Sequence, residues 1–183
     1  MFIGDWFSDC AIMYSILEEV KYYSGTERKE MLYVKSNEGG SMLYGTTWKS
    51  FLTYRDGKQV LREHDKETGK YKTKVYSEHP ELKAIFKEFA DYHFPDFDYS
   101  QVQMNKSFPC PPHFDSANIG ESVLCVFGDF LDGETCLYNE ETRKIEKYDA
   151  RLKPFKFNGS KILHWVKPIR SKGIRYSLVF FSN

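Results

Sequence analysis

The sequence lacks the features that mark disulfide-bonded, secreted and membrane-spanning proteins. Its four cysteines, at positions 10, 110, 125 and 136, form no CxxC pair and no other metal-ligand spacing, so we expect reduced, buried thiols. No apolar run reaches about 18 residues, and the N-terminus has no basic segment followed by a long apolar one. These absences predict a soluble, intracellular protein, cytoplasmic or nuclear, with no membrane partner.

The chain also lacks an excess of charge of either sign. Lys plus Arg and Asp plus Glu both total 26, which argues against binding to nucleic acid by bulk charge but leaves room for a local basic patch. The sequence contains no internal repeat, low-complexity segment or Pro/Gly/Ser-rich linker. With 183 residues, we expect a single domain that spans residues 1–183.

Aromatic residues are abundant, at 17% of the chain, and this composition favours half-buried strands. Two segments nevertheless have helical periodicity. The first runs from Ser8 to Tyr23, with Ser8 or Asp9 as the N-cap and Gly25 as the stop. The second begins at Pro80, ends before Pro95 and has an apolar face made by Leu82, Ile85, Phe86 and Phe89.

The remaining segments have the patterns of strands and turns. Residues 31–61 predict hairpins, with turns at 37–40 and 56–57, and the charged stretch 62–74 predicts a solvated loop or exposed hairpin. Beyond residue 95 come short strands in DYSQVQMNK, SVLCVFGDF, ETCLYN, LKPFKF, KILHWV and RYSLVFF. We therefore expect a mostly β protein with a helical buttress (α+β): residues 1–98 form a helical and hairpin support, and residues 99–183 form a sandwich or open barrel.

A possible metal site comes from His113, Asp115 and His164. Residues i and i+2 of a strand point to the same side, so His113 and Asp115 can both face a barrel interior. His164 follows Asp115 after 48 intervening residues, in the predicted strand KILHWV, and can supply a third ligand. Two imidazoles and one carboxylate on one face of a metal are the ligand set of non-haem iron(II) oxygenases.

A possible carboxylate anchor lies eleven residues after His164. Arg175 and Ser177 share one face of the last predicted strand. The guanidinium group presents a rigid fork suited to a carboxylate, and a hydroxyl two residues later can bind the same oxygens. This pair predicts a site for the far carboxylate of a dicarboxylic acid whose other end chelates the metal.

Taken together, His-x-Asp, a distant strand His and Arg-x-Ser resemble the Fe(II)/2-oxoglutarate-dependent dioxygenase superfamily, over roughly residues 99–183. The resemblance implies a double-stranded β-helix (jelly-roll, cupin-like) core with Fe(II) on His113, Asp115 and His164. It also implies that Arg175 and Ser177 hold 2-oxoglutarate, with Asn105 beside it, and that dioxygen is consumed. The expected activity is that of an oxidoreductase that hydroxylates a C–H bond.

The run HFDSANIGESVLCVFGDFLDGETCLY also resembles the branch that contains TET and J-binding-protein oxygenases, although Asp132-Gly133-Glu134 replaces the usual paired glycines. This resemblance implies a nucleobase methyl group (5-methylpyrimidine) in DNA or RNA as the substrate. Segments rich in Tyr and Lys, at 31–35, 44–54 and 70–76, are candidates for holding the nucleic acid strand.

Other interpretations remain open at the level of sequence. The substrate of a dioxygenase can instead be a prolyl or lysyl side chain, or a small molecule, because the fold does not fix it. A different class is a non-catalytic β-barrel binding module, with or without structural zinc. Within the site, His113 and Asp115 could cap a turn, His164 could be a core residue, and Arg170 competes with Arg175 as the anchor.

Overall fold

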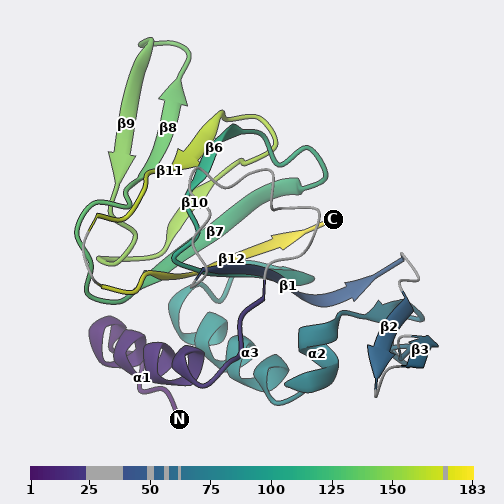
Figure 1. Cartoon of the computed structure of the whole chain (residues 1–183). Helices are drawn as coiled ribbons and strands as arrows, with labels where there is room; N and C mark the ends of the chain where they lie inside the picture. The colour runs from purple at the N-terminus through teal and green to yellow at the C-terminus, as the bar shows by residue number, and fades with distance from the viewer. Residues whose placement is uncertain (24–38, 49–51, 56–57, 62, 171–172) are drawn as a thin grey trace.

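The computed structural model of the protein describes residues 1–23, 39–48, 52–55, 58–61, 63–170 and 173–183. Two antiparallel sheets dominate it (Figure 1). The larger sheet has six strands in the spatial order β10 (Phe155–Phe157), β7 (Ile119–Phe127), β12 (Tyr176–Ser182), β5 (Gln101–Lys106), β1 (Gly40–Thr47) and β4 (Tyr71–Lys72). The smaller sheet has four strands in the order β6 (Cys110–His113), β11 (His164–Val166), β8 (Thr135–Asn139) and β9 (Lys144–Tyr148).

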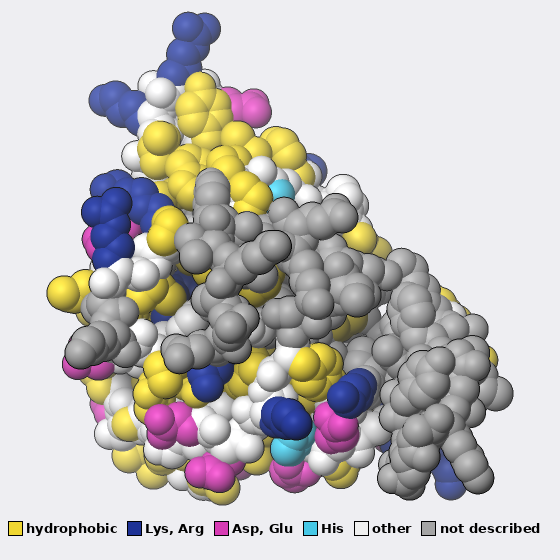
Figure 2. Space-filling view, in the orientation of Figure 1, with side chains coloured by type: hydrophobic (Ala, Val, Ile, Leu, Met, Phe, Trp, Pro, Cys, Tyr) yellow, Lys and Arg dark blue, Asp and Glu magenta, His cyan; other side chains and the backbone are white. Residues whose placement is uncertain are grey.

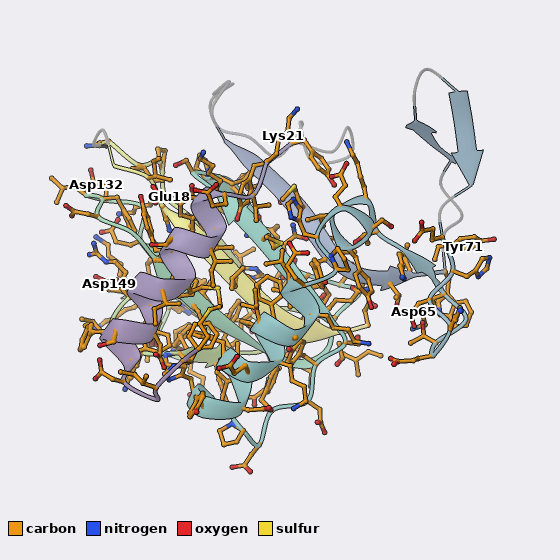
Figure 3. All side chains as sticks on the ribbon, turned by 90° about the horizontal axis from the view of Figure 1, so that it is seen from below. Glu18, Lys21, Asp65, Tyr71, Asp132 and Asp149 are labelled. Atoms are coloured by element: carbon orange, nitrogen blue, oxygen red, sulfur yellow. The ribbon has the colours of Figure 1, made fainter. Side chains whose placement is uncertain are left out.

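Three helices, α1 (Trp6–Glu18), α2 (Lys74–Glu78) and α3 (Leu82–His93), lie beneath the larger sheet, on the side away from the smaller one (Figures 1 and 3). A further hairpin, β2 (Leu52–Arg55) with β3 (Lys58–Leu61), stands to one side. Among the described helices, none is long and apolar enough to span a bilayer. Helices on one face of a mostly antiparallel pair of sheets match the predicted α+β class.

The sequence of β12 shows how the larger sheet separates a helix-facing core from the site. Tyr176, Leu178 and Phe180 belong to the apolar cluster that the helices cover, with Met13 and Leu17 of α1 and Phe86 and Phe89 of α3. The alternate residues Ser177, Val179 and Phe181 line a pocket on the other face. Since successive side chains of a strand point to opposite faces, one strand serves both the core and the site.

The helix predictions are confirmed in kind but differ at the ends. Helix α1 begins earlier than predicted, because Asp5 rather than Ser8 or Asp9 is the N-cap and its side chain accepts a hydrogen bond from the Ser8 backbone N–H. Asp9 is instead fully buried and accepts from the Gly4 backbone N–H and pairs with His93. The helix ends at Glu18, before the predicted end, and Gly25 lies outside the described residues.

The strand predictions beyond residue 95 are confirmed, but two strands were not predicted. β6 has the sequence CPPH and β9 has KIEKY, so neither shows apolar alternation. Both lie at edges of the four-stranded sheet, where prolines and charges are tolerated because one side of the backbone needs no partner strand. The hairpin predicted around 56–57 is present as β2 and β3, whereas the predicted turn at 37–40 and the run at 31–34 lie largely outside the described residues.

The region before residue 98 does more than cover the sheet. β1 pairs with β5 over six residue pairs and so is an interior strand of the larger sheet. The charged stretch after residue 62 forms an exposed hairpin whose turn is organised by Asp65, a buried carboxylate that accepts hydrogen bonds from Thr68 and Tyr76. The larger sheet therefore contains strands from both sides of residue 98, where the sequence analysis separated the support region from the core.

Candidate metal centre and carboxylate pocket

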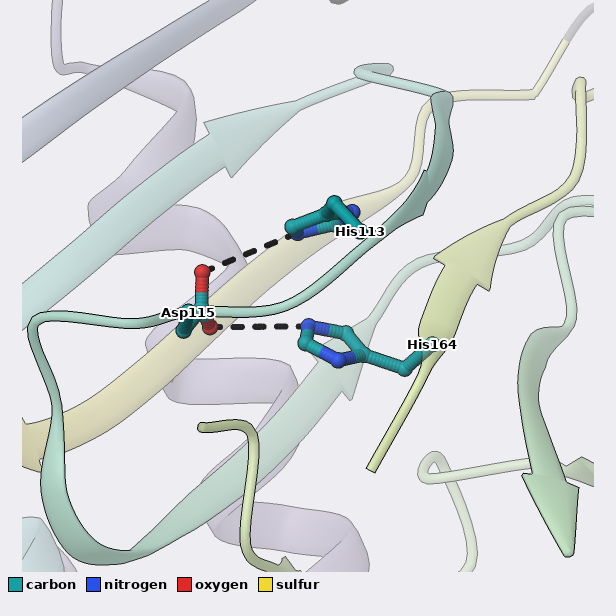
Figure 4. Close-up of side chains that lie close together, drawn as sticks. All are labelled: His113, Asp115 and His164. Carbon is teal, nitrogen blue, oxygen red and sulfur yellow. Dashed lines mark ion pairs between the residues drawn. The ribbon is translucent and has the colours of Figure 1, made fainter. Parts of the chain in front are cut away.

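His113, Asp115 and His164 lie close together, with Asp115 facing both imidazole rings (Figure 4). His113 is opposite His164 in the antiparallel pair of β6 and β11. Their Nε2 atoms lie 3.6 and 3.5 Å from the two carboxylate oxygens of Asp115. One ligand atom from each residue falls within 4.8 Å of the others, so the three side chains can bind one metal ion.

Backbone carbonyl groups fix the orientation of both imidazole rings. The Nδ1–H of His113 donates to the Pro111 carbonyl oxygen at 2.8 Å, and that of His164 donates to the Ile162 carbonyl oxygen at 2.9 Å. A carbonyl oxygen only accepts, so each ring carries its proton on Nδ1 when neutral. This tautomer presents the Nε2 lone pair toward Asp115, as a metal ligand requires.

Asp115 is held from the backbone of a distant loop. The expectation that it shares a strand with His113 is wrong, since β6 ends at His113 and Asp115 lies in the turn that follows. Its backbone N–H donates to the Gly159 carbonyl oxygen at 2.9 Å. A Cβ atom at Gly159 would lie 3.1 Å from Asp115 Oδ2 and 3.4 Å from His164 Cε1, so glycine keeps this side of the cluster open.

The three residues line a pocket of about 80 Å³ that runs between the sheets to Arg175. Arg175 is 1% exposed, and its guanidinium group donates to Ser177 Oγ at 3.1 Å and to Thr135 Oγ1 at 3.3 Å. Its Nε atom has no hydrogen-bond partner, and no described carboxylate forms an ion pair with it. Burial lowers the pKa of Arg175 to about 10. The charge of Asp149 acts on Arg175 only from beyond ion-pair distance. A buried cation that no carboxylate contacts is costly, which favours an anionic ligand at this end.

The competing anchor, Arg170, lies elsewhere. Its side chain is 84% exposed and its Nε atom is 3.8 Å from Asp132 at the surface. Gly133, in the turn that replaces the paired glycines, has φ +69°, and a Cβ atom there would lie 3.3 Å from Arg175 Cδ and 2.9 Å from Ile169 Cγ1. This turn therefore packs against the stem of Arg175 and needs glycine for two reasons.

The structure places Asn105 and Ser177 in the same pocket, side by side on β5 and β12. Asn105 Nδ2 donates to Ser177 Oγ at 3.3 Å. Sequence reasoning missed Thr135, Gln103 and Gly159, which also shape the pocket. Once the strand register is known, alternation places the side chains of Thr135 and Gln103 on the pocket face. No local sequence pattern indicates that Gly159 lies beside the metal ligands.

Comparisons with known proteins bear on the fold. No family model matches the sequence, and no curated protein matches it. Among solved structures, a 2OG-Fe(II) oxygenase family oxidoreductase from Burkholderia pseudomallei aligns over 94% of this chain and 77% of its own, at 14% identity and TM-score 0.55. NgTET1 in complex with 5mC DNA aligns over 92% of this chain and 68% of its own, at 17% identity and TM-score 0.49. A prolyl-4-hydroxylase from Pseudomonas putida aligns over 98% of this chain and 87% of its own, at 9% identity and TM-score 0.42.

The first of these likenesses establishes the fold of the chain. The antiparallel sheets of this chain have the arrangement found in that 2OG-Fe(II) oxygenase family protein. The predicted jelly-roll core is therefore confirmed, and the resemblance to the superfamily is confirmed at the level of fold.

Proposed function

We propose that this chain is an Fe(II)- and 2-oxoglutarate-dependent dioxygenase, with residues 1–183 acting as one domain. A single observation carries the proposal: one pocket has a His-Asp-His cluster at its mouth and a buried arginine without a carboxylate at its far end. 2-Oxoglutarate has a 2-oxo acid that chelates a metal and a second carboxylate for the arginine. When bound, Fe(II) and 2-oxoglutarate supply the activation of dioxygen and the oxidation of a C–H bond.

The donor set fits iron(II) better than structural zinc. Structural zinc sites are closed by four protein ligands, usually with cysteine thiolates. In the part of the chain that the structure describes, the cluster has three members, two histidines and one aspartate. Three protein ligands on one side of an octahedral metal leave the opposite positions open. In proteins with two histidines and one carboxylate, a chelating co-substrate and dioxygen bind at these open positions. A structural metal would give no role to Arg175.

The chain's own residues have distinct tasks in this proposal. His113, Asp115 and His164 bind the metal, and the Pro111 and Ile162 carbonyl groups hold the two imidazoles in the ligating tautomer. Arg175, Ser177 and Thr135 bind the far carboxylate. Phe157 packs edge-on against His164 at 5.0 Å and keeps water from that side of the pocket.

For the substrate we propose a nucleobase methyl group in DNA or RNA, on the strength of the TET-like run that begins at His113. An exposed aromatic side chain beside the pocket supports it, since Phe114, which lies between the pocket residues His113 and Asp115, is 48% exposed. Apolar side chains gather over the β8–β9 hairpin and neighbouring strands, and Lys and Arg side chains lie at the hairpin tip (Figure 2). Such a surface offers stacking and phosphate contacts to a flipped base.

The test is succinate formation from 2-oxoglutarate after anaerobic loading with Fe(II) and exposure to air. Wild type should form succinate, and His113→Ala and Asp115→Ala should abolish it. A wild type that binds neither Fe(II) nor 2-oxoglutarate contradicts the proposal and favours a binding module. Mobility shifts with single- and double-stranded DNA and RNA at low salt test the substrate separately, and absence of any shift favours a protein or small-molecule substrate.

A further inference from the structure

A row of polar side chains crosses three strands behind the carboxylate pocket. Ser41 on β1 is opposite Asn105 on β5, and Asn105 is opposite Ser177 on β12. Ser41 and Ser177 are buried, at 4% and 2% exposed. Asn105 and Ser177 line the pocket, whereas Ser41 lies one strand further away and does not.

The hydrogen bonds along this row have a direction. Gln103 Nε2 donates to Ser41 Oγ at 2.9 Å. The Ser41 hydroxyl donates to Asn105 Oδ1 at 2.7 Å, and Asn105 Nδ2 then donates to Ser177 Oγ at 3.3 Å. Arg175 donates to the same Ser177 oxygen.

This direction decides what Ser177 offers a ligand. A serine hydroxyl accepts two hydrogen bonds and donates one. Ser177 Oγ already accepts from Asn105 and Arg175, and the described residues provide no acceptor for its proton. Its proton is therefore available to the pocket, where a carboxylate oxygen can accept it. If the Asn105 amide were turned over, Ser177 would donate to Asn105 Oδ1 instead, and the pocket would lose this donor.

We infer that Ser41 is a positioning residue for the carboxylate pocket, and this inference rests on the proposed function. By donating to Asn105 Oδ1, Ser41 holds the amide in the orientation that keeps the Ser177 proton directed at the far carboxylate of 2-oxoglutarate. A residue from the region before residue 98 thus acts on co-substrate affinity through two intervening side chains, without touching the ligand.

The experiment compares binding of two ligands by calorimetry, with Mn(II) as a metal that does not turn over. 2-Oxoglutarate has the far carboxylate and 2-oxobutyrate lacks it. Ser41→Ala should weaken 2-oxoglutarate binding by roughly three- to tenfold, the scale of one ordinary hydrogen bond, because the bond from Ser177 is weakened rather than removed, and should leave 2-oxobutyrate and Mn(II) binding unchanged. Ser41→Thr, which keeps the hydroxyl, should restore wild-type affinity. Thr46→Ala, which removes a hydroxyl from the same strand away from the pocket, is the matched control.

The outcomes separate the inference from the proposed function. Equal affinities of wild type and Ser41→Ala for 2-oxoglutarate, or equal losses for both ligands, overturn the role of Ser41 and leave the function standing. A wild type that binds Mn(II) but not 2-oxoglutarate overturns both. If Ser41→Ala lowers the Tm, Ser41→Cys, close in size with a weaker donor, replaces it and should show an intermediate loss confined to 2-oxoglutarate.

Discussion

His113 and His164 face each other across β6 and β11, with ring centroids 4.3 Å apart and both Nδ1 atoms turned to backbone carbonyl groups. Removing one ring removes one of three metal ligands. Loss of an outer-shell partner alone typically costs 10- to 100-fold in metal affinity, so we expect His113→Ala and His164→Ala each to weaken Mn(II) binding by more than about 100-fold. Calorimetry measures this. His79→Ala, which alters a histidine paired with Glu81 outside the pocket, should bind normally.

The second prediction concerns Gly159, which lies beside the metal ligands Asp115 and His164 and has no side chain to contact them. Gly159→Ala places a Cβ atom 3.1 Å from Asp115 Oδ2, and the carboxylate must move. We expect metal affinity to fall by about tenfold, the lower end of outer-shell effects, with little change in Tm. Mn(II) titration and thermal unfolding of the metal-free protein measure the two quantities. An unchanged affinity would show that the carboxylate accommodates the methyl group.

We expect Arg175 to bind 2-oxoglutarate and to lower the free energy of unfolding of the ligand-free protein. Arg175→Met keeps an unbranched side chain and removes a buried charge that has no carboxylate partner among the described residues. We expect loss of 2-oxoglutarate binding, together with a free energy of unfolding of the ligand-free protein that rises by about 1–3 kcal/mol. Urea unfolding and calorimetry measure both. Arg170→Met, at the exposed competing position, should change neither, and loss of binding there instead would reassign the anchor.

Gly133 and Gly69 form a matched pair for testing the turn beside Arg175. Both have positive φ, +69° and +67°, but a Cβ atom at Gly133 would contact Ile169 and Arg175, whereas one at Gly69 would meet nothing within 4 Å. Each alanine variant should lose about 1–3 kcal/mol of stability from backbone strain. Only Gly133→Ala should also weaken 2-oxoglutarate binding, because Arg175 is displaced. Equal 2-oxoglutarate affinities of the two variants would contradict the prediction that the turn at Gly133 positions Arg175.

Asp65 predicts a pH dependence of stability. Burial raises its pKa, but hydrogen bonds from Thr68 and Tyr76 outweigh this and hold the pKa below its ordinary value of 3.8. The carboxylate therefore stabilises the fold above about pH 4, and this stabilisation is lost as the pH falls through the folded-state pKa. Asp65→Asn should cost about 1–3 kcal/mol at pH 7, and the gap should narrow below pH 4. Urea unfolding between pH 2.5 and about 7 measures it. A gap independent of pH would exclude the carboxylate as the cause.

The sequence by itself determined the site residues that belong to regular motifs and the class of the fold. His113, Asp115, His164, Arg175, Ser177 and Asn105 were named from spacing and resemblance, and the structure brings all six to one pocket. A short apolar segment bounded by turn residues is a local pattern, so β5, β7 and β12 could be recognised from their own residues. The binding roles of these residues stay a prediction.

Only the tertiary structure decided which residues support that site. Gly159 contacts Asp115 and Ser41 contacts Asn105 across 44 and 64 positions of sequence, and no local pattern encodes a pairing register between distant strands. The sequence already favoured Arg175 over Arg170 as the anchor, but only packing shows that the Arg175 guanidinium is buried and that of Arg170 is exposed. β6 and β9 escaped prediction because their strand conformation comes from a neighbouring strand rather than from their own residues.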